Sequence, residues 1–216
     1  MANFNSQLYS SMKQPIIISI GRQFGSGGRN IGKALAKELG FDYYDKELIT
    51  LVAKESGFNP ELFESADEKP PRNLFFQWLD GVFSGGYHYD NYLSSDALFK
   101  MQSDVIRKLA EEKSCVIVGR CSDYVLRDNP NCISIFLYSS MEDRIKRVRG
   151  CRETKKEEVM EIIKLADKHR ASYYNYYSSK TWGEARTYTL SVDVSSLGEP
   201  ETVNFIRTFL KMKFGI

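Results

Sequence analysis

The residues best suited to chemistry stand in a glycine-rich run, GRQFGSGGR, at residues 21–29. The run follows a short β-branched stretch, residues 16–20, and precedes a stretch with helical periodicity at residues 29–39. In a strand–loop–helix unit of this kind, glycines allow backbone N–H groups to converge on an anion, and the helix N-terminus adds partial positive charge. Phosphate is the anion that such a loop suits. The alternative is a tight strand-to-helix turn that binds no ligand.

The loop offers both space and hydrogen-bond donors to a phosphate group. Gly25, Gly27 and Gly28 lack the Cβ atoms that would block close approach, and Ser26 adds a hydroxyl donor. The predicted phosphate-binding residues are Gly21, Arg22, Gly25, Ser26, Gly27, Gly28, Arg29 and Asn30.

The P-loop signature GxxxxGK[ST] can be placed on this segment in two ways. A literal match runs from Gly27 to Gly32 and Lys33, but Ala34 follows where a hydroxyl residue is required. This match would also bury the Gly-Lys pair inside a helix whose apolar stripe already begins at Ile31. We therefore reject the literal match.

The second placement equates residues 27–30, GGRN, with the GKGT of nucleoside monophosphate kinases. Gly28 then stands where the lysine belongs, and Asn30 stands where the hydroxyl belongs. The phosphate charge must be met by another cation, most simply Arg29 or Arg22. A guanidinium group holds phosphate through two parallel hydrogen bonds, so arginine can replace lysine in this role.

The elements around the loop alternate between strand and helix along the chain. This alternation predicts an α/β protein with the P-loop NTPase fold, in which helices flank a mostly parallel sheet of about five strands. Ligands of such sheets bind at the carboxyl ends of the strands. Strand patterns occur at residues 16–20, 41–45, 115–118, 132–138 and 187–194, and helix patterns occur at residues 29–39, 46–56, 96–111, 141–149, 155–170 and 199–212.

A single domain, residues 15–216, follows a polar leader at residues 1–14. Within the domain, residues 57–95 contain Pro-Pro and Gly-Gly pairs and many aromatic residues, and we interpret them as an inserted substrate-binding region. Their aromatic side chains could line an acceptor pocket or form the interface of a homodimer.

Composition argues against several other functions. The 30 basic and 28 acidic residues give a net charge of +2, so the chain lacks the overall positive field of a nucleic-acid binder. No segment approaches the roughly 18 apolar residues of a membrane span. The two histidines disfavour a histidine-rich metal centre and a Ser-His-Asp triad. The four cysteines show no Cys-x-x-Cys spacing, which fits a reduced, cytoplasmic protein.

Several segments together resemble the cytidylate kinase-like proteins, whose glycine-rich loop reads RQxGSGGR, as residues 22–29 do here. The resemblance continues in FDYYDKELI at residues 41–49, in VIVGRCSDY at residues 116–124 and in DKHR at residues 167–170. It implies a kinase that takes ATP as its phosphoryl donor, with Mg²⁺, and a small acceptor, in the first place a nucleoside monophosphate. The protein ligands of Mg²⁺ are not indicated.

The resemblance also implies roles for residues outside the loop. Gly119-Arg120 matches the start of a Gly-Arg-Asp segment, Cys121 replaces the aspartate, and Asp123 is the nearest carboxylate. Phosphoryl transfer depends on positioning and on positive charge around the transferred group. The implied catalytic residues are Arg29, Arg120, Asp123, Arg149 and Arg170, the acceptor-binding residues are Asp45 and Arg120, and the lid residues, within about residues 144–172, are Arg144, Arg147, Arg152 and Asp167.

Plainer structural roles remain open for the residues of the lid. Its arginines could form a solvated helix face balanced by nearby acidic residues, and Asp167 with Arg170 could form an i, i+3 surface ion pair. The tyrosines of residues 173–177 favour packing of one helix face over stacking on a base. Three functions stay open: a kinase of a nucleoside monophosphate, a kinase of another small molecule, and a nucleotide-binding module without catalysis.

Overall fold

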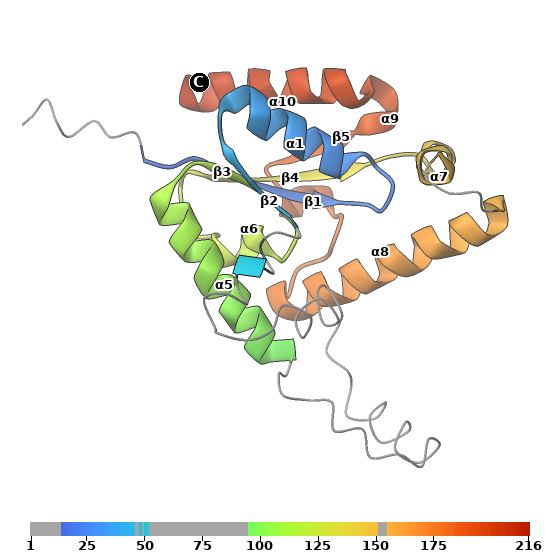
Figure 1. The fold of residues 1–216 in the computed structure, drawn as a ribbon, viewed down its shortest axis with the longest axis horizontal. Coiled ribbons are helices and arrows are strands. Elements are labelled where there is room, and N and C mark those ends of the chain that lie inside the picture. The colour runs from blue at the N-terminus through green and yellow to red at the C-terminus, as the bar shows by residue number, and fades with distance from the viewer. Residues whose placement is uncertain (1–13, 46–47, 49, 52–94, 151–154) are drawn as a thin grey trace, which may run out of the picture.

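A parallel sheet of five strands forms the centre of the protein, and helices cover both of its faces (Figure 1). The computed structural model describes residues 14–45, 48, 50–51, 95–150 and 155–216. The strands pair in the order β2-β3-β1-β4-β5, and every pairing is parallel, which confirms the predicted fold. Their bounds are β1 (Ile17–Arg22), β2 (Asp42–Tyr44), β3 (Cys115–Val118), β4 (Cys132–Tyr138) and β5 (Leu190–Asp193).

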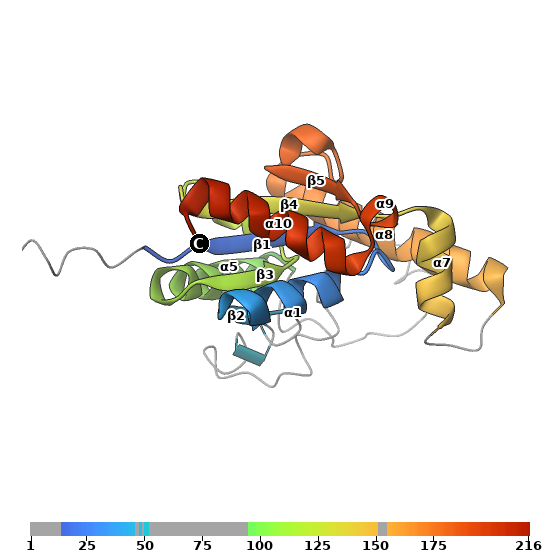
Figure 2. The same cartoon turned by 90° about the horizontal axis from the view of Figure 1, so that it is seen from above.

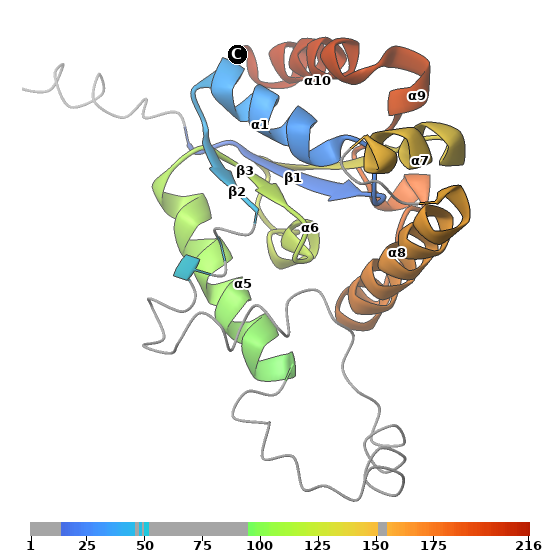
Figure 3. The same ribbon diagram turned by 45° about the vertical axis from the view of Figure 1, so that its right-hand side comes forward.

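The helices fall into three groups around this sheet. Their bounds are α1 (Gly28–Leu39), α5 (Ser95–Glu112), α6 (Ser122–Val125), α7 (Met141–Arg149), α8 (Lys156–Ser178), α9 (Val194–Leu197) and α10 (Glu199–Phe214). Helices α1 and α10 lie on one face, and α5 and α6 lie on the other (Figures 1 and 2). Helices α7 and α8 lie side by side at the end of the sheet where β1 leads into α1 (Figure 3).

The side chains of β1 alternate between two cores. Ile18 and Ile20 pack in the core on the α1 and α10 face, whereas Ile17 packs in the core on the α5 face. Because both faces of a parallel sheet are covered, its strands need apolar residues at successive positions. This requirement explains why the apolar runs gave the bounds of β3 and β4 correctly. Helix α1 presents Ile31 and Leu35 to the sheet.

The C-terminal half departs from the sequence prediction at several element ends. The strand predicted at residues 187–194 is confined to β5, and a short 3₁₀ helix, η1 (Ala185–Thr187), precedes it. The Asp193 side chain accepts from the Ser195 N–H and so begins α9. Helix α8 continues past residue 170 because Tyr173 and Tyr174 are buried against the domain, as their predicted packing requires. Helices α6 and α9 were missed because each is a single turn.

Some predictions fall on residues that the structure does not describe. The polar leader, most of the helix predicted at residues 46–56 and almost all of the insertion at residues 57–95 lie outside the described residues. In the part that is described, no helix combines the length and apolar character needed to cross a membrane.

Candidate active site

The glycine-rich loop joins the carboxyl end of β1 to the first turn of α1. Gly25 and Gly27 adopt φ values of 77° and 87°, which residues with a Cβ rarely adopt. Gly27 is the N-cap of α1, so the first N–H groups of the helix have no intrahelical acceptor. Ser26 is fully buried, and its Oγ has no hydrogen-bond partner within the described part of the chain. A buried hydroxyl without a partner costs about 1–3 kcal/mol, so the loop favours a ligand that accepts from it.

Two arginines of α7 hold the outer side of this loop. Arg144 donates from Nε to the Phe24 carbonyl (2.8 Å) and forms an ion pair with Asp167 of α8. The Oδ1 atom of Asp167 accepts from the Phe24 N–H (2.7 Å). One turn further along α7, Arg147 donates to the Gly25 carbonyl (3.0 Å). Both arginines therefore contact the backbone of the loop, and their interpretation as part of a solvated helix face is wrong.

Three arginines converge on Asp45, a buried residue that follows β2 directly. Arg120 Nη1 and Arg29 Nε each lie 2.9 Å from its carboxylate oxygens, and Arg22 Nη2 lies at 3.9 Å. The side chain of Arg120 is 2% exposed, whereas that of Arg29 is 50% exposed. Three guanidinium charges that face one carboxylate leave a local excess of positive charge, which suits an anionic ligand.

The turn after β3 directs Arg120 toward Asp45. Gly119, Arg120 and Cys121 follow one another with φ values of 83°, 55° and 53°. A non-glycine residue in this left-handed region costs about 1 kcal/mol or more, and such residues concentrate at functional sites. The turn folds the Arg120 side chain back, so that it donates to the Val118 carbonyl (2.9 Å) as well as to Asp45. The two residues that the family resemblance assigned to the acceptor are thus in direct contact.

A pocket adjoins this cluster at the carboxyl ends of β1 and β3. Arg22 and Arg120 belong to both the cluster and the pocket, and Arg170 adds a further cation from α8. Aromatic rings form much of the remaining wall. The lining residues are Ser19, Gly21, Arg22, Gly119, Arg120, Cys121, Asp123, Arg170, Tyr173, Tyr174, Trp182 and Tyr188.

Asp123 lies in the wall of the pocket, where Tyr174 donates to its Oδ2 atom (2.6 Å). Burial raises the pKa of Asp123 above its usual value, although the hydrogen bond from Tyr174 partly offsets this effect. Burial and the nearby Asp123 carboxylate also raise the pKa of Tyr174, so its hydroxyl stays protonated at neutral pH. The two side chains form a fixed hydrogen-bonded pair on the wall of the pocket.

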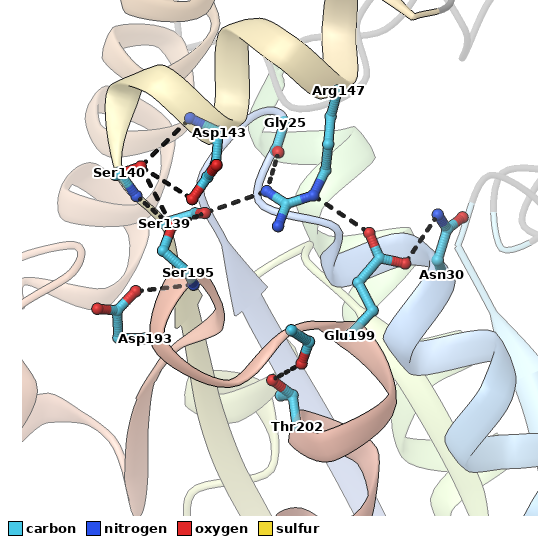
Figure 4. A network of polar contacts seen from close by, with 11 residues as sticks. Gly25, Asn30, Ser139, Ser140, Asp143, Arg147, Asp193, Ser195, Glu199 and Thr202 are labelled. Carbon is cyan, nitrogen blue, oxygen red and sulfur yellow. Dashed lines mark hydrogen bonds and ion pairs between the residues drawn. The ribbon is translucent and has the colours of Figure 1, made fainter.

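Beside the glycine-rich loop, Glu199 at the start of α10 joins three elements (Figure 4). Its carboxylate accepts from Asn30 Nδ2 (3.2 Å) and pairs with Arg147 Nε (3.3 Å). Arg147 also donates to Ser139 Oγ (3.0 Å), which is hydrogen-bonded to Ser195 Oγ (2.6 Å). Sequence reasoning missed Glu199 and both serines, because no local pattern links positions so distant in the chain.

A comparison with known proteins now places this geometry in a family. Residues 17–196 match the sequence profile of the cytidylate kinase-like family. The chain belongs to the cytidylate kinase-like family. An uncharacterized protein from Eubacterium ventriosum ATCC 27560 has a similar structure, with a TM-score of 0.67 and 30% identity over 91% of this chain and 98% of that chain.

A shikimate kinase from Bacteroides thetaiotaomicron shares the fold of this cytidylate kinase-like chain. Its TM-score is 0.51 at 15% identity, and the match covers 91% of this chain and 98% of that chain. No curated protein sequence matches the chain closely enough to count as a relative. The family is therefore the cytidylate kinase-like family, and the fold is one that a shikimate kinase also has.

The remaining arginines of the cytidylate kinase-like chain have distinct surroundings. Arg170 donates to the Arg22 carbonyl (3.3 Å), and Asp167 forms its ion pair with Arg144 of α7. The interpretation of Asp167 and Arg170 as a surface ion pair is therefore wrong. Arg149 is exposed at the last position of α7. Arg152 lies outside the described residues.

Gly21 of the predicted site and Gly32 of the rejected P-loop match both lie inside regular elements. Gly21 is inside β1, where a Cβ atom would lie 3.0 Å from the ring of Phe136. Gly32 and Lys33 both lie inside α1, as the rejection of the literal P-loop match expected, although only Gly32 is buried and Lys33 is exposed. The segment that joins β1 to α1 therefore covers residues 23–27.

The described residues of the cytidylate kinase-like site contain no preformed metal-binding site. No group of three or more His, Cys, Asp or Glu side chains stands close enough together to hold an ion there. The carboxylates of Asp45, Asp167 and Glu199 beside the loop each contact an arginine. Because Mg²⁺ often binds through substrate phosphates with only one or two carboxylates, this arrangement does not conflict with an ion that arrives with a nucleotide.

Proposed function

We propose that this protein transfers a phosphoryl group from ATP to a small acceptor, with a nucleoside monophosphate as the first acceptor class. The observation that carries the proposal is the position of the two arginines that flank the glycine-rich loop. Arg22 ends β1 and Arg29 lies in the first turn of α1, and both face Asp45. A phosphate in the loop would therefore lie beside the excess positive charge where an acceptor binds.

Two arginines of the cluster, Arg29 and Arg120, suit different roles in phosphoryl transfer. Arg29 is half-exposed, so its side chain can turn from Asp45 toward a phosphate oxygen and supply the charge of the absent lysine. Arg120 is buried and fixed, so it can orient Asp45 and an anionic group of the acceptor. Asp45 can accept a hydrogen bond from an acceptor hydroxyl, and Mg²⁺ on the ATP phosphates would neutralise charge during transfer.

The absence of a lysine at Gly28 has a steric cause in this chain. A Cβ atom at Gly28 would lie 2.8 Å from the Cβ of Arg22, so a side chain has no room there. The same observation supports a second candidate function, a nucleotide-binding module without catalysis. In that case the loop binds nucleotide, and Arg29 stays on Asp45.

The composition of the pocket supports a third candidate, a kinase with another small acceptor. Cationic Arg170 and the rings of Tyr173 and Trp182 could hold any acidic compound with a ring. The described cysteines form no disulfide with one another, which fits the proposed cytoplasmic setting of such an enzyme.

An ADP-release assay separates these functions. The protein is mixed with Mg²⁺, ATP and a panel of nucleoside monophosphates, nucleosides, small alcohols and ring acids. We expect ADP that depends on one acceptor and falls strongly in Arg29→Ala. Arg107→Ala is the matched control, because Arg107 is also half-exposed (52%) and also forms an ion pair, but on α5.

The outcome of the same panel distinguishes the second candidate from the first. A rise in melting temperature with ATP or ADP but no acceptor-dependent ADP would favour the binding module. If no nucleotide produces either a thermal shift or turnover, both functions are contradicted.

A further inference from the structure

We propose that Arg144 and Asp167 act as positioning residues that hold the glycine-rich loop in its phosphate-binding shape. We call this pair the loop clamp. The proposal rests on the proposed function, because it assigns these residues an effect on phosphate affinity. It differs from the lid role that the sequence suggested for them.

The loop clamp occupies both polar groups of Phe24. Asp167 accepts from the Phe24 N–H at 2.7 Å, and Arg144 donates to the Phe24 carbonyl at 2.8 Å. The clamp residues also pair with each other, and both of their side chains are largely buried. The peptide groups on either side of Phe24 are therefore fixed from outside the loop, by α7 and α8.

Helix α7 also packs directly on the next residue of the loop. A Cβ atom at Gly25 would lie 3.0 Å from both the Arg144 carbonyl oxygen and Val148 Cγ2. The Gly25 carbonyl accepts from Arg147 (3.0 Å). Both carbonyl oxygens, of Phe24 and of Gly25, are thus turned toward α7, so neither repels an anion bound on the N–H groups of the loop.

A glycine-rich loop needs such external support, because glycine loses more conformational freedom on ordering than any other residue. When contacts fix the loop in advance, the ligand does not have to order it. Fixing the backbone of one residue corresponds to about a tenfold gain in affinity. We therefore expect the clamp to act on phosphate affinity as well as on stability.

Helix α8 links the clamp to the acceptor pocket. Arg170, one turn after Asp167, donates to the Arg22 carbonyl and lies 5.5 Å from the centre of the Phe24 ring. Tyr173 and Tyr174 follow on the same helix and form part of the pocket wall. Asp167 of the clamp and part of the pocket wall therefore belong to the same helix.

The test uses inorganic pyrophosphate and ATP as probes, with calorimetry for affinity and thermal melting for stability. In Arg144→Lys the charge is kept, but a single ammonium group cannot reproduce the Nε bond to Phe24 and the guanidinium pair with Asp167. We expect at least a tenfold loss of pyrophosphate affinity. Asp167→Asn keeps an acceptor for the Phe24 N–H, so it should bind more tightly than Asp167→Ala.

The matched control is Lys164→Ala, which removes an exposed ion pair with Glu161 from the same helix. It should bind both probes as the wild type does. If Arg144→Lys does not fold, the order of Asp167→Asn and Asp167→Ala decides the question. Clamp variants that bind pyrophosphate within twofold of the wild type, however unstable, would overturn the clamp alone. A wild-type protein that binds neither probe would overturn the proposed function and the clamp together.

Discussion

Arg120 and Arg29 approach the same carboxylate at the same distance, and the difference in their burial sets the cost of removing each one. Both lie 2.9 Å from Asp45, but the side chain of Arg120 is 2% exposed and that of Arg29 is 50% exposed. Breaking a buried ion pair costs about 3–5 kcal/mol, whereas an exposed pair contributes about 0–1 kcal/mol. Arg22 and Arg29 still face Asp45 after Arg120→Ala, so we expect the lower limit, about 3 kcal/mol.

These free energies translate into distinct melting temperatures. A domain of this size shifts by roughly 2–4 °C for each kcal/mol, so Arg120→Ala should lower the melting temperature by about 6–12 °C. Arg29→Ala should lower it by less than about 4 °C, although it should weaken ATP binding.

Urea denaturation followed by circular dichroism measures both variants, in buffer without phosphate so that no anion enters the cluster. Arg107→Ala again provides the exposed control, because its ion pair with Asp104 lies on α5. Equal losses of unfolding free energy in Arg120→Ala and Arg29→Ala would refute the reasoning. So would a loss below about 1 kcal/mol for Arg120→Ala, since a buried guanidinium paired with a carboxylate cannot be that inexpensive to remove.

Three further predictions concern the loop and the pocket wall. Gly27→Ala should lower the unfolding free energy, measured in urea, by about 1–2 kcal/mol or more, because φ is 87° and the new Cβ would lie 2.6 Å from Glu199 Oε1. Adding Glu199→Ala should recover only part of this loss, because it removes the close contact but not the strained φ value. Gly28→Lys, which restores the P-loop lysine, should weaken ATP binding in calorimetry because Arg22 occupies the space; tighter binding would contradict this. Asp123→Asn should change the pH dependence of stability. Because folding raises the pKa of Asp123, the wild type loses stability as pH rises from the usual value of 3.8 through the raised one, and the variant should lack that loss; parallel urea profiles from pH 4 to 8 would contradict it.

The sequence predicted the sheet well because the requirement behind each strand is local. A parallel strand covered on both faces must be apolar at successive positions, and residues 115–118 and 132–138 show such runs. The end of α8 was set too early, because Tyr173 and Tyr174 owe their place to partners elsewhere in the fold.

The site was harder to predict because its contacts join distant parts of the chain. Helical periodicity places Arg144 and Arg147 on one side of a helix but does not say what that side meets. Their partners in the loop, Phe24 and Gly25, lie 120 and 122 residues away. Composition left a solvated helix face open for these arginines, whereas tertiary packing buries Arg144 and turns it toward the loop.

The central claim is that the glycine-rich loop binds a phosphate group, and Ser26 tests it most directly. Its Oγ atom is buried and has no hydrogen-bond partner among the described residues. Without a ligand this unpaired hydroxyl lowers the stability of the protein, and with a bound phosphate it can donate a hydrogen bond. Without ligand, Ser26→Ala should be more stable than the wild type by about 1 kcal/mol in urea. Saturating pyrophosphate or ATP should raise the melting temperature of the wild type clearly and that of Ser26→Ala much less. A wild-type protein whose melting temperature responds to neither compound would contradict the claim.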